Sequence, residues 1–274
     1  CWTGLAPASA QRRAAAAPPG ATGEGAFAIG RGASTDGIAS FAIGVDAAAS
    51  GDDAVAIGHS ALANNSQTTA IGGNASANGY SATAFGFTSE ANGQQSAAFG
   101  SGAKAEGAFS SALGPASRAG DNSTAVGYFA EANGNTSTAI GYGAKTNITN
   151  ATAVGGNHAK ANGEGGSAFG SLANASGNYS TAVGFDANAS GTNSIAIGRR
   201  TRATEKDTVA IGEKANASGT SAIAIGKSSK GFDPCAIAIG ASANAGNQSI
   251  AIGASACATK QHAISIGCSA KATE

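Results

Sequence analysis

The sequence predicts an all-β solenoid, a parallel β-roll built from short coils of about 14 residues that stack along one axis. The first observation is a repeated motif that ends in glycine, of which Asn193-Ser194-Ile195-Ala196-Ile197-Gly198 is a clear copy. The second is its spacing: there are 18 copies, and 14 of the 17 steps between their closing glycines are 14 residues long. A fixed short period of this kind is the signature of a repeat architecture. The closing glycines are Gly30, Gly44, Gly58, Gly72, Gly86, Gly100, Gly114, Gly127, Gly141, Gly155, Gly170, Gly184, Gly198, Gly212, Gly226, Gly240, Gly253 and Gly267.

Composition agrees with a thin core that is repeated many times. The 274 residues include 42 Gly, only 5% are aromatic, and the 42% hydrophobic share is largely alanine. Such a chain has too few large side chains to fill the interior of a thick globular domain at the usual packing density. The regular placement of Ile, Val and Phe argues against a disordered polar chain.

Within one repeat, alternation predicts two short strands and two corners. Large or β-branched residues such as Ile195 and Ile197 stand three and one before the closing glycine, so we expect a strand with both side chains facing inward. A second alternating run has alanine three and five residues after the glycine, as in Ala187 and Ala189, again expected to face inward. A second glycine usually follows seven residues after the first, as at Gly191, and would turn the other corner.

The residue two before the closing glycine is alanine in 17 of 18 copies, with Ser265 as the exception. If the large neighbours face inward, this alanine faces outward, where a solvent-exposed strand would tolerate many polar residues. A face held this small predicts that a second backbone packs closely against it, and therefore a parallel, in-register oligomer. Low-complexity drift is the competing explanation. The residues assigned to the interface are Ala56, Ala70, Ala84, Ala125, Ala139, Ala182, Ala196, Ala210, Ala224 and Ala238.

The motif residues 193–201 resemble the N-S-V-A-I-G-x-x-S motif of YadA-like heads of trimeric autotransporter adhesins. Residues 122–127 and 248–253 are further close copies, and the resemblance covers about residues 26–272. It implies a left-handed parallel β-roll assembled as a parallel homotrimer of three identical chains. Many copies depart from the motif and read Thr-Ala-Ile-Gly or Thr-Ala-Val-Gly. On this basis residues 21–274 are expected to be head repeats, without the family's coiled-coil stalk and membrane anchor.

The resemblance also implies a function. Such heads are exported by type V secretion and displayed at the cell surface from the outer membrane of Gram-negative bacteria. They bind host cells or extracellular matrix proteins such as collagen, fibronectin or laminin, and often cause autoagglutination and serve virulence. An alternative is a structural or ice-binding rod, suggested by ranks such as Thr124, Thr138 and Thr152, although these were expected to face inward.

Candidate ligand contacts are the residues that vary around the motif. Residues 199–207 form the densest charge cluster, and the segment 227–234 breaks the pattern with Phe232, which is expected to be exposed. Solvated corners are the competing explanation for both segments. The 15-residue step near 157–166 predicts a bulged corner. The residues proposed for ligand contact are Arg199, Arg200, Arg202, Asn193 and Ser194.

Other classes of function find no support in the sequence. His59, His158 and His262 occupy three different places in the repeat and form no arrangement for nucleophilic catalysis, so no enzyme is predicted. A hexapeptide acyltransferase would need three strands and about 18 residues per coil. Neither a cofactor nor a metal site is expected, because acidic residues are scattered and no CxxC spacing occurs. The net charge of +0 and the 12% share of charged residues predict no nucleic-acid footprint, and no apolar run is long enough to insert into a membrane.

Residues 1–20 are interpreted as a leader or linker. Ala8-Ser9-Ala10 fits the cleavage pattern of a secretory signal, and a flexible leader explains the segment equally well. Cys1, Cys235, Cys257 and Cys268 are interpreted as incidental small residues, with a single disulfide as the alternative.

Overall fold

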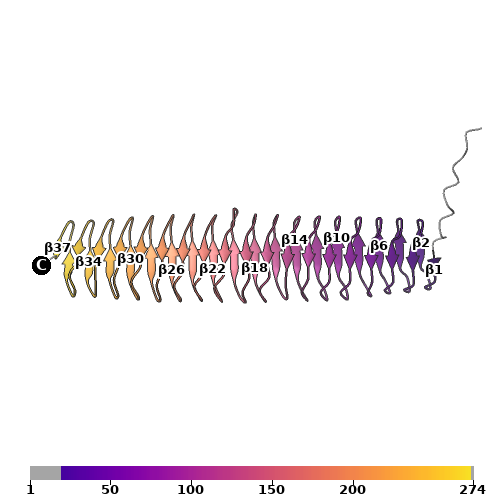
Figure 1. Ribbon diagram of the computed structural model, residues 1–274, viewed down its shortest axis with the longest axis horizontal. Coiled ribbons are helices and arrows are strands. Elements are labelled where there is room, and N and C mark those ends of the chain that lie inside the picture. The colour runs from indigo at the N-terminus through magenta and orange to yellow at the C-terminus, as the bar shows by residue number, and fades with distance from the viewer. Residues whose placement is uncertain (1–19, 273–274) are drawn as a thin grey trace, which may run out of the picture.

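The computed structural model describes residues 20–272 and shows a straight rod of stacked coils (Figure 1). Each coil contributes one strand of three residues and one of two residues, and the part described contains no helix. Residues 20–272 therefore include no helix that is long and apolar enough to cross a membrane. The interpretation of the leader concerns residues that, apart from Gly20, lie outside the described range.

The three-residue strands carry the even numbers. They are β2 (Phe27–Ile29), β4 (Phe41–Ile43), β6 (Val55–Ile57), β8 (Thr69–Ile71), β10 (Thr83–Phe85), β12 (Ala97–Phe99), β14 (Ser111–Leu113), β16 (Thr124–Val126), β18 (Thr138–Ile140), β20 (Thr152–Val154), β22 (Ser167–Phe169), β24 (Thr181–Val183), β26 (Ile195–Ile197), β28 (Val209–Ile211), β30 (Ile223–Ile225), β32 (Ile237–Ile239), β34 (Ile250–Ile252) and β36 (Ile264–Ile266).

The two-residue strands carry the odd numbers. They are β1 (Gly20–Ala21), β3 (Ser34–Thr35), β5 (Ala48–Ala49), β7 (Leu62–Ala63), β9 (Ser76–Ala77), β11 (Glu90–Ala91), β13 (Lys104–Ala105), β15 (Arg118–Ala119), β17 (Glu131–Ala132), β19 (Lys145–Thr146), β21 (Lys160–Ala161), β23 (Asn174–Ala175), β25 (Asn188–Ala189), β27 (Arg202–Ala203), β29 (Asn216–Ala217), β31 (Lys230–Gly231), β33 (Asn244–Ala245), β35 (Cys257–Ala258) and β37 (Lys271–Ala272).

Each strand pairs in parallel with the equivalent strand of the coils above and below. In β10 and β12, Ala84 lies beside Ala98 and Phe85 beside Phe99, a shift of one coil. The two-residue strands pair in the same way within residues 20–272 and form a 19-stranded sheet. Identical positions of successive coils therefore form rows along the rod, separated by one strand spacing of about 4.8 Å. This confirms the predicted all-β parallel solenoid of 14-residue, two-strand coils.

The interior of the roll is lined by small residues from both sheets. The alanines three and five residues after the closing glycine are fully buried, as predicted, for example Ala187 and Ala189. Facing them are the residues four and two before that glycine, such as Ser194 and Ala196, which are also fully buried. No large side chain is among the buried residues that are described, and threonine is the largest fully buried one. The core is thus alanine packed on alanine.

The predicted orientation of the three-residue strands was wrong. The large residues three and one before the closing glycine face outward, and Ile197 is 38% exposed. The alanine between them faces inward and cannot form the surface that was assigned to it. Alternation fixes which residues share a face, but a one-residue shift in the assignment reverses inside and outside. The ten assigned interface residues, all 0% exposed, are Ala56, Ala70, Ala84, Ala125, Ala139, Ala182, Ala196, Ala210, Ala224 and Ala238.

The two glycines of a repeat are required for different reasons. The closing glycine has a backbone that side chains avoid: Gly198 has a φ of 132°, and a Cβ there would approach the carbonyl oxygen of Gly212 to 2.7 Å. The second glycine does not have positive φ. At Gly79 a Cβ would lie 1.8 Å from the carbonyl oxygen of Gly93 in the next coil, so close stacking of the coils favours glycine.

The irregular step produces the predicted bulge. The corner between β20 and β21 has one additional turn residue, and both Asn157 and His158 adopt a left-handed conformation there. One corner accordingly protrudes beyond its neighbours between the labels β18 and β22 in Figure 1. The His158 ring packs edge-on against Tyr142, with 5.5 Å between ring centroids.

Candidate functional site

The outer face of the three-residue strands is an apolar stripe that runs along the rod. We define this stripe as the residues three and one before each closing glycine. The residue one before is Ile, Leu, Val or Phe in every coil, whereas the residue three before is large and apolar near both ends of the rod and mostly Thr or Ser from β8 to β24. Its side chains stack in register between coils, with ring centroids 5.2 Å apart for Phe27 and Phe41 and 6.2 Å apart for Phe85 and Phe99. Phe85 is 50% exposed. A contiguous exposed apolar surface of this kind marks an interaction site.

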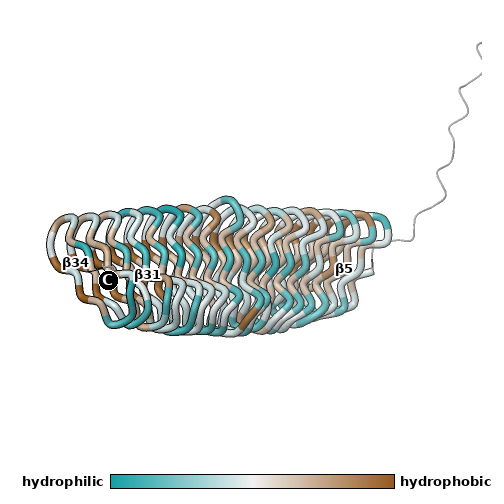
Figure 2. Tube along the Cα trace, turned by 60° about the vertical axis from the view of Figure 1, so that its left-hand side comes forward, coloured by the Kyte–Doolittle hydropathy of each residue, from teal (hydrophilic) through white to brown (hydrophobic). Residues whose placement is uncertain are grey.

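The outer face of the two-residue strands is polar and charged. The residue four after each closing glycine (five after Gly155, because of the bulge) points outward from this sheet, and in the middle of the rod it is charged in successive coils from β11 to β21. Hydrophilic colour gathers largely at the corners of the coils in Figure 2. The two outer faces of a single coil therefore differ in chemistry. The polar outer face of the two-residue strands agrees with the alternation of alanine and polar residues in the sequence.

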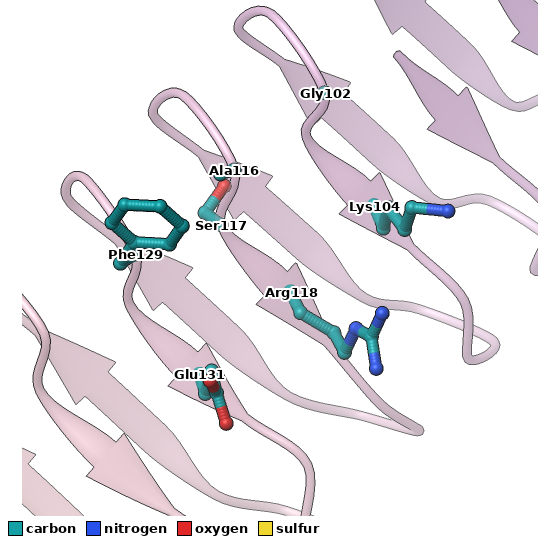
Figure 3. Close-up of a pocket in the computed structure, with 7 residues that line it drawn as sticks. All are labelled: Gly102, Lys104, Ala116, Ser117, Arg118, Phe129 and Glu131. Atoms are coloured by element: carbon teal, nitrogen blue, oxygen red, sulfur yellow. The ribbon is translucent and has the colours of Figure 1, made fainter. Parts of the chain in front are cut away.

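In the middle of the rod the charges of the polar face neutralise one another. Lys104 Nζ lies 2.9 Å from Glu90 Oε1, and Lys145 Nζ lies 2.5 Å from Glu131 Oε2. Arg118 Nε lies 3.5 Å from Glu106 Oε1. Figure 3 shows the hollow between β13, β15 and β17, where Lys104, Arg118 and Glu131 project from neighbouring strands. Lys104, Arg118 and Lys145 each have a glutamate as ion-pair partner, so little net charge is available to a ligand.

The residues predicted for ligand contact do not all reach the surface. Ser194 is fully buried, and its hydroxyl has no hydrogen-bond partner, so its assignment to ligand contact was wrong. Asn193 is exposed, but its side-chain amide donates to Asp207 at 2.9 Å. Among the arginines, Arg199 forms an ion pair with Glu213. Arg200 makes a longer contact, with 3.9 Å between its Nε and Asp186 Oδ2. Arg202 is exposed on β27.

The positive charges around Glu213 lower the pKa of its carboxyl group. The guanidinium of Arg199 donates a hydrogen bond to Glu213, and with its positive charge it lowers the pKa of that carboxyl below the ordinary value. Lys227 and Lys214 lower the same pKa further by their charges. The ionised form of Glu213 is therefore favoured, and its direct hydrogen-bond partner is Arg199.

A second hollow is lined by cations and uncharged residues, without any carboxylate. About 300 Å³ in volume, it lies over β27, β29 and β31, and Arg200 and Arg202 line it together with two residues that the sequence did not single out, Lys214 and Lys230. Its remaining lining residues are Ala215 and Asn216. Lys230 could have been predicted from the sequence, because it stands at the same place in its repeat as Arg202, two coils later.

The other interruptions of the pattern lie at corners. Phe232 is 43% exposed as predicted, and the ammonium of Lys230 lies over its ring at 5.6 Å from the centroid. Cys235, Cys257 and Cys268 form no disulfide with one another. Within residues 20–272, no group of three or more His, Cys, Asp or Glu side chains is placed to hold a metal ion.

The family described as the YadA head domain repeat (2 copies) matches this chain repeatedly. The matched segments overlap and together cover most of residues 21–229. Among curated protein sequences, none matches the chain closely enough to count as a relative. The matched segments are 21–47, 36–61, 49–75, 63–89, 77–103, 91–117, 119–144, 132–157, 161–187, 175–201 and 203–229.

Proposed function

This chain belongs to the YadA head repeat family, and on that premise we propose that it is the head of a trimeric autotransporter adhesin displayed at the surface of a Gram-negative cell. In the proposal, three identical chains form a parallel homotrimer of left-handed rolls. The family implies this class of adhesin-like solenoid. The proposal adds the assembly, the display and a host ligand.

The single observation that carries the proposal is the apolar stripe. Its residue one before the closing glycine is Ile, Leu, Val or Phe in every coil, yet partly exposed in one chain, because the interior of the roll is too narrow to hold such side chains. Burial of such side chains stabilises an assembly by about 25 cal/mol for each Å² removed from water. A closed, symmetric contact in which equal coils meet at equal heights buries the stripe along the whole rod. The alanine between the stripe residues, such as Ala196, is buried inside the roll, so the proposed contact is made by outward residues such as Ile197.

With the stripe buried in the trimer, the polar faces and the corners remain for ligands. We propose that they bind host cells or matrix proteins of the collagen, fibronectin or laminin type. Three equivalent copies of each contact, repeated along a rod, suit an extended ligand that is held by many weak sites. The same exposed faces would support autoagglutination between cells.

Light scattering on the purified chain tests the assembly, and solid-phase binding to collagen, fibronectin and laminin tests the adhesin. We expect the mass of three chains and saturable binding to at least one matrix protein. A monomer at high protein concentration would contradict the proposed interface. A trimer that binds none of the three proteins would contradict the proposed ligand class.

One observation keeps the ice-binding rod as a second candidate. Thr124, Thr138 and Thr152 were expected to face inward, but they face outward from β16, β18 and β20 and pair in register. A regular threonine ladder of this kind is available to ice only if the stripe is not covered by other chains. Inhibition of ice recrystallisation by the purified protein would support this candidate, and its absence in a trimeric sample would exclude it.

A further inference from the structure

The cations of the hollow over β27, β29 and β31 are largely without ion pairs in the described part of the chain. Of the four that line it, only Arg200 forms one, at 3.9 Å from Asp186. Arg202, Lys214 and Lys230 form no ion pair with any residue in the described part of the chain. Like charges that face one hollow repel one another, so an anion bound between them would be stabilised by all four.

The arrangement of the cations follows the axis of the rod. Arg202, Asn216 and Lys230 are neighbours in one row of the polar sheet. Arg202 and Lys230 are therefore roughly 10 Å apart, two strand spacings, with an uncharged amide between them. Arg200 and Lys214 stand in the adjacent row at the corner. The hollow thus presents positive charge along a line, which suits a linear ligand that carries anionic groups at intervals.

We propose that this hollow, lined by Arg200, Arg202, Lys214 and Lys230, binds a linear polysaccharide that carries sulfate or carboxylate groups. The guanidinium of arginine presents two parallel donors to such a group, and the lysines add point charges on either side. The inference names a ligand class for the head and rests on the proposed function for the surface display that would expose it.

The lining favours a polysaccharide over a nucleic acid. Proteins that bind single strands combine cations with aromatic faces on which the bases stack. None of the six residues that line this hollow is aromatic, and the nearby ring of Phe232 already carries the ammonium of Lys230. The hollow therefore offers charge and hydrogen bonds, which sulfated or carboxylated sugars can use, and no stacking surface for bases.

The paired charges between β11 and β19 provide a matched control on the same sheet. Lys104 and Lys145 occupy the same place in their repeats as Arg202 and Lys230, but each is paired with a glutamate. Replacing either pair of cations by glutamine changes the net charge by the same amount. A difference in binding between the two double variants then reports on the hollow and not on the overall charge of the rod.

The test is binding of the purified chain to immobilised heparin, measured at several salt concentrations. We expect Arg202→Gln with Lys230→Gln to weaken binding about tenfold and to flatten its dependence on salt, because two contacts that release counterions are lost. Lys104→Gln with Lys145→Gln should change the affinity less than about twofold, since its cations are already neutralised. Neutral dextran should not compete.

Three results would overturn the proposal: an equal loss in both double variants, competition by dextran, or binding of a single-stranded oligodeoxynucleotide with the same affinity and the same dependence on Arg202 and Lys230. Light scattering on the same samples separates this inference from the function on which it rests. A monomeric chain that binds heparin through the hollow refutes the trimer alone. A trimer whose variants bind heparin as well as the parent refutes the hollow alone.

Discussion

The outer faces of the two sheets belong to the same coils and differ completely in chemistry. The three-residue strands present a continuous row of Ile, Leu, Val or Phe, such as Ile197 in β26, whereas most two-residue strands present a polar or charged residue, such as Arg202 in β27. In a single chain both faces are outside, and the true interior holds only small residues. Hydrophobicity therefore does not mark the inside of this roll. In the proposed trimer, it marks the surface that the other two chains cover.

The difference also separates structure from specificity along the rod. Within the stripe, the row one before the closing glycine stays apolar in every coil, as a continuous contact between equal rods requires. The polar face changes from paired charges around β13 to unpaired cations around β27. Recognition of a ligand is thus expected to depend on the position along the polar face, and assembly on the stripe as a whole.

The largest effect is expected from charges placed in the stripe. Ile197 and Ile211 are neighbours on β26 and β28, and Ile197→Asp with Ile211→Asp would bury unpaired carboxylates in the proposed interface. Each buried, unpaired charge costs about 3 kcal/mol or more. We expect the trimer to dissociate by light scattering while the β-sheet signal in circular dichroism persists. Asn216→Asp on the polar face should leave the mass unchanged, and an unaltered trimer in the double variant would refute the stripe as the interface.

The next effect concerns the interior. Ala196 is fully buried within the alanine cluster, so Ala196→Leu must displace neighbouring backbone. Overpacking of this kind usually costs about 1–3 kcal/mol. We expect a lower midpoint of thermal unfolding, with Ile195→Leu on the outer face as the control that stays close to the parent. If Ala196→Leu kept the thermal midpoint and lost only the trimer, Ala196 would be an interface residue after all.

The sequence was sufficient for the period, the strands and the corners because these depend on local pattern. A closing glycine such as Gly198 and a buried pair such as Ala187 and Ala189 follow from backbone geometry and alternation. Orientation does not follow from alternation, since both Ile195 and Ala196 fit a strand that alternates. Large apolar residues are usually buried, and this preference led to the wrong prediction of which face of the three-residue strands is inside. The sequence does contain a pattern that indicates the correct orientation. The positions of Ser194 and Ala196 are small in successive repeats, as are those of Ala187 and Ala189, and two rows of small residues on each sheet can face each other in a narrow interior.

The candidate site was only partly predictable for a related reason. The charge cluster of residues 199–207 is contiguous in sequence, so Arg200 and Arg202 were found. Lys214 and Lys230 join them from later coils, and a row of the sheet brings together residues 14 or 28 positions apart. Ser194 was assigned to ligand contact because it belongs to the motif, but its side chain points into the roll.

A smaller effect is expected on the polar face itself. The pair of Lys104 and Glu90 is about one third exposed on each side, so screening by solvent leaves it little net energy. A double-mutant cycle with Lys104→Ala and Glu90→Ala should give a coupling of about 0.2–1 kcal/mol in thermal or denaturant unfolding, reduced by added salt. A coupling well above that range would show that the charge ladder, and not only the stripe and the interior, stabilises the rod.

The smallest expected effect is the titration of Glu213. Arg199 holds its pKa below the ordinary value, so the folded state favours the ionised carboxylate more than the unfolded chain does. This contribution is fully present above the ordinary pKa of glutamate and is lost as the pH falls through the lowered value. Arg199→Gln should move the pKa of Glu213 upward in a carbon-detected NMR titration, and stability between the two values should then depend less on pH. Lys227→Gln, which removes a more distant charge at 4.0 Å, should move it less. An equal upward shift in both variants would mean that general positive charge, and not the Arg199 hydrogen bond, engages Glu213 beside the cationic hollow.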